Sequence, residues 1–190
     1  MKAAPLAALL MAIALLLPAR ARAAASTELD DAVYVVRTSK DPAKRLKAVQ
    51  KLGELKDSRS VAYLIDALHP MTSDPRDDWF VRTACVTSLV RIGAPAVDPL
   101  RKAVTDPSPI VRARVLEALT KLRAPGVVEL LAKRLKNDPE VEVRIACVAE
   151  MRDLGDKAAL PPLREAAQRD QSPIVRERAA SIADKLAAGS

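Results

Sequence analysis

The side chains in this 190-residue sequence that could carry chemistry are one histidine, two cysteines and several neighbouring acids. His69 lies in the stretch from Leu68 to Phe80, which also holds Asp77 and Asp78. A catalytic histidine needs an orienting carboxylate and usually a nucleophile close by in space, and no spacing here fixes such a set. The adjacent acids stand near an expected helix start, where the helix dipole favours negative charge. We therefore expect helix caps and a turn histidine, with no catalytic residue, no cofactor and no metal.

A recurring phrase that opens with aspartate and closes with arginine organises the chain. It reads Asp-Pro-Ser-Pro-Ile-Val-Arg at Asp106–Arg112, Asp-Pro-Glu-Val-Glu-Val-Arg at Asp138–Arg144 and Asp-Gln-Ser-Pro-Ile-Val-Arg at Asp170–Arg176. Aspartate is a good helix N-cap and proline is favoured at the first helical position. Each phrase therefore predicts the start of a helix, and the copies recur about every 32 residues, a spacing typical of helical repeats.

Each unit contains two apolar stretches at helical spacing, and small aliphatic residues supply nearly all of the apolar content. We predict an all-α fold, an α-solenoid of antiparallel helix pairs with about four and a half repeats. In the leading helix, Thr27 and Asp30 have the spacing of a capping box. The expected segments are an N-terminal capping helix at 24–40, helix pairs at 41–73, 74–105, 106–137 and 138–169, and a half unit at 170–190.

The order of residues within a unit has a known counterpart. It comprises Asp106-Pro107 with Val111-Arg112, then Ala118-Leu119 and Leu122, then Val128, Leu131 and Leu135. This pattern resembles HEAT repeats, in the short form of phycobilisome-lyase-like proteins, and Trp79 before Val81-Arg82 is similar to a frequent tryptophan of that family. The resemblance covers Asp41 to about Leu186. It implies a partner-binding surface on the second helices, and also an alternative, a bilin-lyase-like accessory or chaperone.

One row of arginines and one of aspartates occupy matching positions in successive units. Stacking brings each arginine near the turn of a neighbouring unit, and HEAT-like folds are similar in using such residues as a ladder between repeats. We expect a structural role, which sets the geometry of the stack. The ladder residues are Arg45, Arg82, Asp106, Arg112, Asp138, Arg144, Asp170 and Arg176.

Cys85 and Cys147 occupy one repeat position two units apart. Packed helices lie about 8–10 Å apart, so two units separate these residues by roughly 20 Å. A disulfide requires Cα atoms within about 7 Å. We therefore predict two buried free thiols.

The first residues have the features of an export signal. Lys2 precedes an uncharged apolar run from Leu6 to Leu17, and small residues alternate from Ala19 to Ala25. The run is shorter than the roughly 20 residues that span a bilayer, so we predict a signal peptide at 1–23 and a periplasmic or secreted bacterial protein. Cleavage after Ala21 or Ala25, or retention as an anchor, remains an alternative. Beyond this segment we expect no integral membrane span.

Removal of residues 1–23 takes away three basic residues and no acids, which leaves 31 − 3 = 28 basic against 24 acidic residues, a net charge of +4. This excess is mild, and aromatics are only 2% of the chain, so we expect no nucleic acid partner.

The second helices supply the predicted binding face for a protein or peptide. Their basic residues concentrate in the middle units, and the alternative is an ordinary solvated surface. The candidate contact residues are Arg101, Lys102, Lys133, Arg134, Lys136 and Arg164, with His69 and Trp79 at the rim. We expect an exported, non-catalytic scaffold, which forms a homodimer, if any, through the half unit at 170–190. A structural envelope assembly factor is a further alternative.

Overall fold

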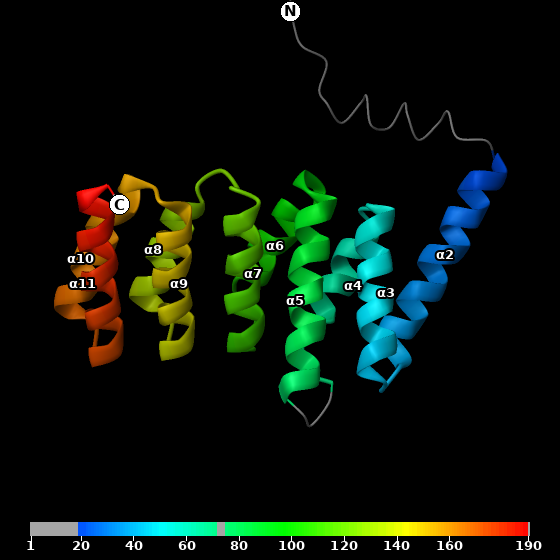
Figure 1. Ribbon diagram of the computed structural model, residues 1–190, viewed down its shortest axis with the longest axis horizontal. Coiled ribbons are helices and arrows are strands. Elements are labelled where there is room, and N and C mark those ends of the chain that lie inside the picture. The colour runs from blue at the N-terminus through cyan, green and yellow to red at the C-terminus, as the bar shows by residue number, and fades with distance from the viewer. Residues whose placement is uncertain (1–18, 72–74, 190) are drawn as a thin grey trace, which may run out of the picture.

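The computed structural model describes residues 19–71 and 75–189, in which it places ten α-helices, two short 3₁₀ turns and no strand. The predicted all-α solenoid is confirmed (Figure 1). The predicted signal peptide at 1–23 lies mostly outside the described residues. The helices are α2 (Ala19–Thr38), α3 (Pro42–Leu55), α4 (Ser60–Asp66), α5 (Pro75–Ile92), α6 (Val97–Ala103), α7 (Pro109–Lys121), α8 (Val127–Asn137), α9 (Val141–Leu154), α10 (Leu160–Arg169) and α11 (Pro173–Ala188), with 3₁₀ turns at Ala94–Ala96 and Lys157–Ala159.

The helices form two layers. The first helices α3, α5, α7, α9 and α11 stand side by side in front, and the second helices α4, α6, α8 and α10 lie behind them (Figure 1). The core fills the space between the layers, where each second helix buries one central leucine completely: Leu64, Leu100, Leu131 and Leu163. These leucines recur because one helical position per unit must face the first-helix layer.

The leading helix α2 starts earlier than predicted. Helix α2 begins at Ala19, so Thr27 lies inside it and the expected capping box with Asp30 is wrong. The alanines before Thr27 are strong helix formers and extend the helix toward the N-terminus. Leu29 and Val36 are buried where α2 packs against α3 and α4, which covers this end of the stack.

The aspartates of the phrase differ in what they do at the helix starts. Asp41 acts as predicted, since its carboxylate accepts the amides of Ala43 and Lys44 at 2.9 and 3.2 Å. In the later units the helix begins after Ser108, Glu140 or Ser172, so the predicted N-cap position was wrong there. The side chains of Asp106, Asp138 and Asp170 each accept a hydrogen bond from the backbone amide two residues later, in a turn that precedes the helix.

The two cysteines are buried and free, as predicted. Burial raises the pKa of Cys85 to about 12, which leaves its thiol uncharged and unreactive. By length and composition, none of the helices in the described ranges could cross a membrane as a single span. A pair at 78–92 and 94–103 meets that test only when the two are joined across a bend of 118°.

Gly53 marks a close approach between α3 and α5. A Cβ atom at this position would lie 2.5 Å from Oγ and 2.8 Å from Cα of Ser88. The Ser88 hydroxyl is itself fixed, because it donates to the carbonyl oxygen of Val49 at 2.9 Å. The contact therefore leaves no room for any side chain on α3 here.

Replacement of Gly53 by alanine should lower the free energy of unfolding by about 1–3 kcal/mol, because the methyl group forces α3 and α5 apart. In an ordinary helix interior the same change stabilises by about 0.5–1 kcal/mol. Chemical unfolding followed by circular dichroism measures the difference, and Gln50→Ala, at an exposed site on the same helix, is the control. A stabilised Gly53→Ala protein would show that the two helices are not in close contact.

Candidate partner-binding face

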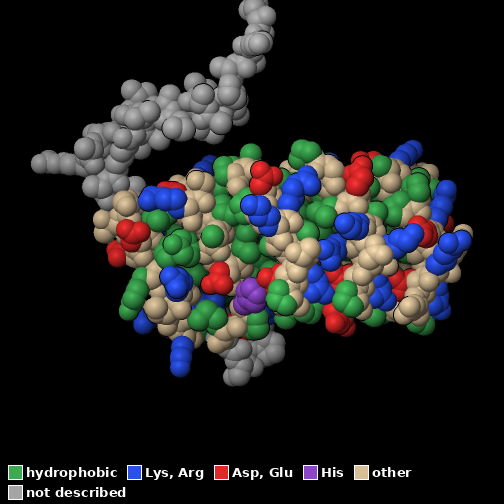
Figure 2. Space-filling view, turned by 180° about the vertical axis from the view of Figure 1, so that it is seen from behind, with side chains coloured by type: hydrophobic (Ala, Val, Ile, Leu, Met, Phe, Trp, Pro, Cys, Tyr) green, Lys and Arg blue, Asp and Glu red, His purple; other side chains and the backbone are tan. Residues whose placement is uncertain are grey.

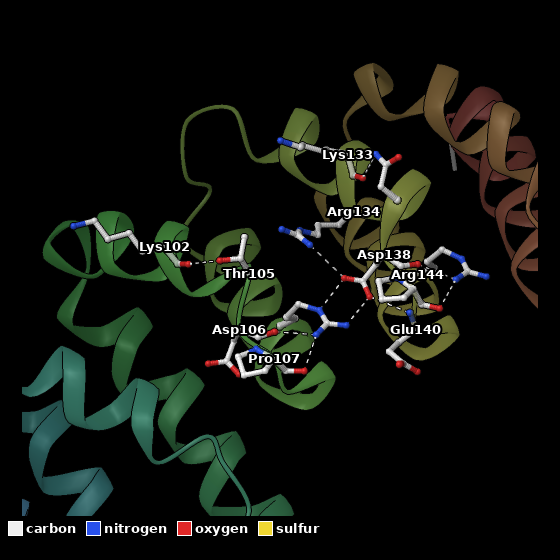
Figure 3. A network of polar contacts seen from close by, with 12 residues as sticks. Lys102, Thr105, Asp106, Pro107, Lys133, Arg134, Asp138, Glu140 and Arg144 are labelled. Carbon is white, nitrogen blue, oxygen red and sulfur yellow. Dashed lines mark hydrogen bonds and ion pairs between the residues drawn. The ribbon is translucent and has the colours of Figure 1, made fainter.

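The second-helix face carries cations that have no acidic partner in the described parts of the chain. Lys102 on α6 and Lys133 on α8 each follow the buried central leucine by two positions, which turns them outward on the helix. Arg164 on α10 follows its leucine by one position and is also exposed. Figure 2 shows this face, with Lys and Arg side chains denser over the half that holds α8 and α10. In Figure 3, Lys102 and Lys133 extend away from the network around Asp138.

Two other residues of the predicted basic set already have partners in neighbouring units. Arg101 donates to the carbonyl oxygen of Pro125. Lys136 donates to Glu165 at 2.7 Å, and this hydrogen bond lowers the pKa of Glu165. These cations join neighbouring units, so the six candidates do not form one uniform patch.

Arg134 is not a surface cation, contrary to the prediction. Its side chain is only 19% exposed, and its Nη1 lies 3.6 Å from Oδ2 of Asp138 on the following turn. Spacing along α8 cannot distinguish an arginine that points outward from one that turns back to the end of its own helix. Arg134 therefore pairs with the residue that caps the C-terminus of its own helix.

A shallow hollow of about 290 Å³ lies between α8 and α10. Ala132, Leu135 and Ala166 supply apolar atoms to it, while Lys136 and Arg169 stand among its polar lining residues. Its shape suits an extended segment or one protruding side chain more than an enclosed small molecule. The acids Glu165 and Asp170 also line the hollow, so its rim carries both signs of charge, while the outward cations of this face lie beyond it.

The arginine and aspartate rows meet in the C-terminal half of the stack. Arg112 donates to Asp138 from Nε at 2.8 Å and from Nη2 at 2.7 Å. Arg144 donates to Asp170 in the same way, at 2.8 and 3.0 Å. In both cases Nη1 donates to two carbonyl oxygens of the arginine's own turn. Such planar, two-bond contacts fix the offset between consecutive units.

These contacts also set the charge of the aspartates. Burial alone would raise the pKa of Asp138, but hydrogen bonds from Arg112 and from the Glu140 amide outweigh it and hold that pKa below its ordinary value. The pKa of Asp170 is lowered in the same way, with Arg144 as the donor.

The ladder is different in the N-terminal half. Arg45 is fully buried, and both its Nη1 and that of Arg82 lie near the carboxylate of Asp78, at 3.6 and 3.7 Å. Asp78 was expected to be a helix cap, but its position one turn before Arg82 lets it attract that arginine. Asp106, which stacking would place opposite Arg82, instead lies 3.3 Å from Nε2 of His69.

His69 lies in the bend after α4 with its side chain 39% exposed, as expected of a turn residue, but it also contacts the next unit. Its Nδ1 lies 3.1 Å from the carbonyl oxygen of Asp66, and its Nε2 faces the Asp106 carboxylate. Both ring nitrogens thus face oxygen acceptors, and the ring bridges the end of α4 to the turn before α7. This contact could not be predicted from the sequence, because His69 and Asp106 are far apart along the chain and belong to different units.

Trp79 and Phe80 are also placed differently from the prediction. Both lie inside α5 and not in a loop, because the helix already begins at Pro75. Their side chains are 49% and 57% exposed and pack edge to face with centroids 5.1 Å apart. Neither side chain is buried against the preceding repeat. They lie on a first helix, away from the second-helix cations.

A stack of paired helices with bonded turns and a second layer of exposed helix faces defines an α-solenoid repeat protein, a class that binds partners on such extended surfaces. The family comparison agrees: HEAT repeats match residues 29–106 and 97–183. The chain therefore belongs to the HEAT-repeat family, whose modules generally serve as non-catalytic protein-interaction scaffolds. A search of curated proteins gave no match to this chain.

Proposed function

We propose that this protein is an exported, non-catalytic scaffold that binds a protein or peptide partner on its second-helix face. The observation that carries the proposal is the row formed by Lys102, Lys133 and Arg164, exposed on three consecutive second helices without acidic partners in the described residues. Cations that make no ion pair within the protein remain available to attract an acidic partner. The composition of residues 1–23 supports export.

The hollow between α8 and α10 complements this row. Its partly exposed apolar lining comes from Ala132 and Pro162, so one apolar group of the partner can be buried there while acids of the partner contact the lysines. Binding of this kind combines a desolvated centre with a charged rim. We therefore propose an acidic segment with at least one apolar side chain as the contact.

Reversal of charge at Lys102 and Lys133 to glutamate should reduce partner capture at least about tenfold, because like charges then face an acidic partner. Capture is measured by crosslinking and quantitative mass spectrometry on the periplasmic fraction, and N-terminal sequencing of the purified protein checks that residues 1–23 have been removed. The control carries Lys40→Glu and Lys47→Glu, which change the net charge equally at exposed sites near the start of the stack. Equal capture by both variants would exclude the basic row as the contact, and a retained Met1 would contradict export.

A further inference from the structure

Arg176 on α11 repeats half of the contact that its counterparts make. Its Nη1 donates to the carbonyl oxygens of Asp170 and Gln171 at 2.8 and 3.2 Å. Arg144 makes the same two bonds to its own turn, at 2.9 and 3.2 Å. The guanidinium of Arg176 is therefore held in the orientation that the internal ladder arginines adopt.

The other half of the contact has no counterpart in the described residues. Arg144 directs Nε and Nη2 at the carboxylate of Asp170, whereas no carboxylate of residues 19–71 or 75–189 lies within ion-pair distance of Arg176. The guanidinium edge formed by Nε and Nη2 of Arg176 is thus held in a fixed orientation, but no carboxylate among the described residues pairs with it.

We propose that Nε and Nη2 of Arg176 bind the carboxylate of an aspartate that begins a helix in a partner protein. A guanidinium presents two parallel donors that match a carboxylate, and two carbonyl oxygens already fix its plane, so little freedom is lost on binding. The carboxylates that fill this position inside the stack, Asp138 and Asp170, also accept the amide two residues on. A helix start that begins with aspartate reproduces that arrangement.

The surface beside Arg176 offers little apolar area, so binding depends mainly on the partner's carboxylate. In the repeat register Ala180 takes the place of Val148 and Leu116, both of which are buried by the next unit. Alanine offers less apolar area than valine or leucine, so a helix that packs here gains less from the hydrophobic effect. Recognition then depends mainly on the two charge-assisted hydrogen bonds to Arg176. This surface is separate from the second-helix face, so the inference stands independently of the proposed function.

The test uses the nitrogen-15 labelled full chain and observes the Nε–H signals of its arginines by NMR. In the free protein we expect the Nε–H of Arg176 to exchange with water at least about tenfold faster than those of Arg112 and Arg144, a factor that corresponds to about 1.4 kcal/mol of hydrogen bonding. The probe is the peptide acetyl-Asp-Pro-Glu-Val-Glu-Val-Arg-amide, the opening of the 138–169 unit. At millimolar peptide the Arg176 signal should shift, saturate and exchange more slowly, while those of Arg112 and Arg144 stay in place.

A matched peptide and two variants complete the test. The same peptide with asparagine in place of its first aspartate should give no shift, and Arg176→Lys should abolish the effect of the aspartate peptide on the backbone amides around residue 176. Arg178→Lys, at an exposed site on the same helix, should leave the response intact. The proposal is overturned if both peptides act alike, if neither acts, or if the Nε–H of Arg176 is already as protected as that of Arg112.

Discussion

Replacement of Asp138 by alanine is expected to lower the free energy of unfolding by about 3–5 kcal/mol, the usual cost of removing one partner of a buried ion pair. The Asp138 carboxylate is almost fully buried and accepts two hydrogen bonds from Arg112 and one from the amide of Glu140. Its loss leaves the buried Arg112 and the partly buried Arg134 without the carboxylate that they share. Urea unfolding measures the change, and a broadened or two-step transition would place the weak point between α7 and α9, since repeat stacks depend on each nearest-neighbour interface.

The matched control is Asp41→Ala, the same change at the same position of the first unit. The Asp41 side chain is 45% exposed and accepts only the two amides of its own turn, with Lys44 at 4.0 Å. Loss of an N-cap alone costs about 1 kcal/mol. Equal destabilisation by the two variants would mean that the Arg112 contact contributes nothing beyond capping.

The acid dependence of the Asp138 contact follows from the direction of its pKa. The folded protein holds that pKa below the ordinary 3.8, so the contact stabilises fully above pH 3.8 and is lost as the pH falls further, through the folded pKa. The difference in stability between the native chain and Asp138→Ala should therefore shrink below pH 3.8 and stay constant above about pH 5.

Replacement of Glu150 by glutamine is expected to stabilise the protein at pH 8 by about 1–3 kcal/mol. Burial, with a smaller contribution from the charge of Glu117, raises the pKa of Glu150 from 4.5 to about 7. Ionisation of a buried carboxyl beside another carboxylate is costly. Glutamine keeps the shape of the side chain without that charge.

The sign of the Glu150 effect is fixed by its raised pKa. The folded state binds the proton more tightly than the unfolded state, so the native chain is favoured below pH 4.5 and loses this stabilisation as the pH rises to about 7. The advantage of Glu150→Gln should accordingly be absent near pH 4 and complete by pH 8, as measured by urea unfolding across that range. Glu142→Gln, at an exposed site on the same helix, should change stability by less than about 0.5 kcal/mol throughout. A pH-independent gain at Glu150 would point to packing and not to charge.

The sequence pattern predicted the core positions correctly but misplaced several helix starts. The central leucines Leu100, Leu131 and Leu163 could be assigned to the core, because burial at one helical position repeats with the helix period. The helix starts after Asp138 and Asp170 were misplaced by two residues, because an aspartate closes a turn before a helix as readily as it caps one. The local sequence is compatible with either role of the aspartate, helix cap or turn residue. The contact with an arginine of the previous unit determines which role it takes.

The candidate site was harder to predict than the fold. Lys102 and Lys133 could be recognised as outward-facing because they share one register on consecutive helices. The bond from Lys136 to Glu165 and the bridge from His69 to Asp106 could not, since they join different units. Their existence depends on the rotation and offset of one helix pair against the next, which no spacing within a unit specifies.

The sequence by itself determined the repeat, the pairing of helices and the solenoid class, because helical periodicity and capping residues act over a few turns of one chain segment. Only the tertiary structure decided which charges remain for a partner. Arg134 and Lys136 have acids within the stack, Lys102 and Lys133 extend from it without one, and Arg176 keeps one edge of its guanidinium oriented but unpaired in the described residues. The physical reason is that an ion pair depends on distance in space, and in a stack of repeats that distance is set by the contact between neighbouring units.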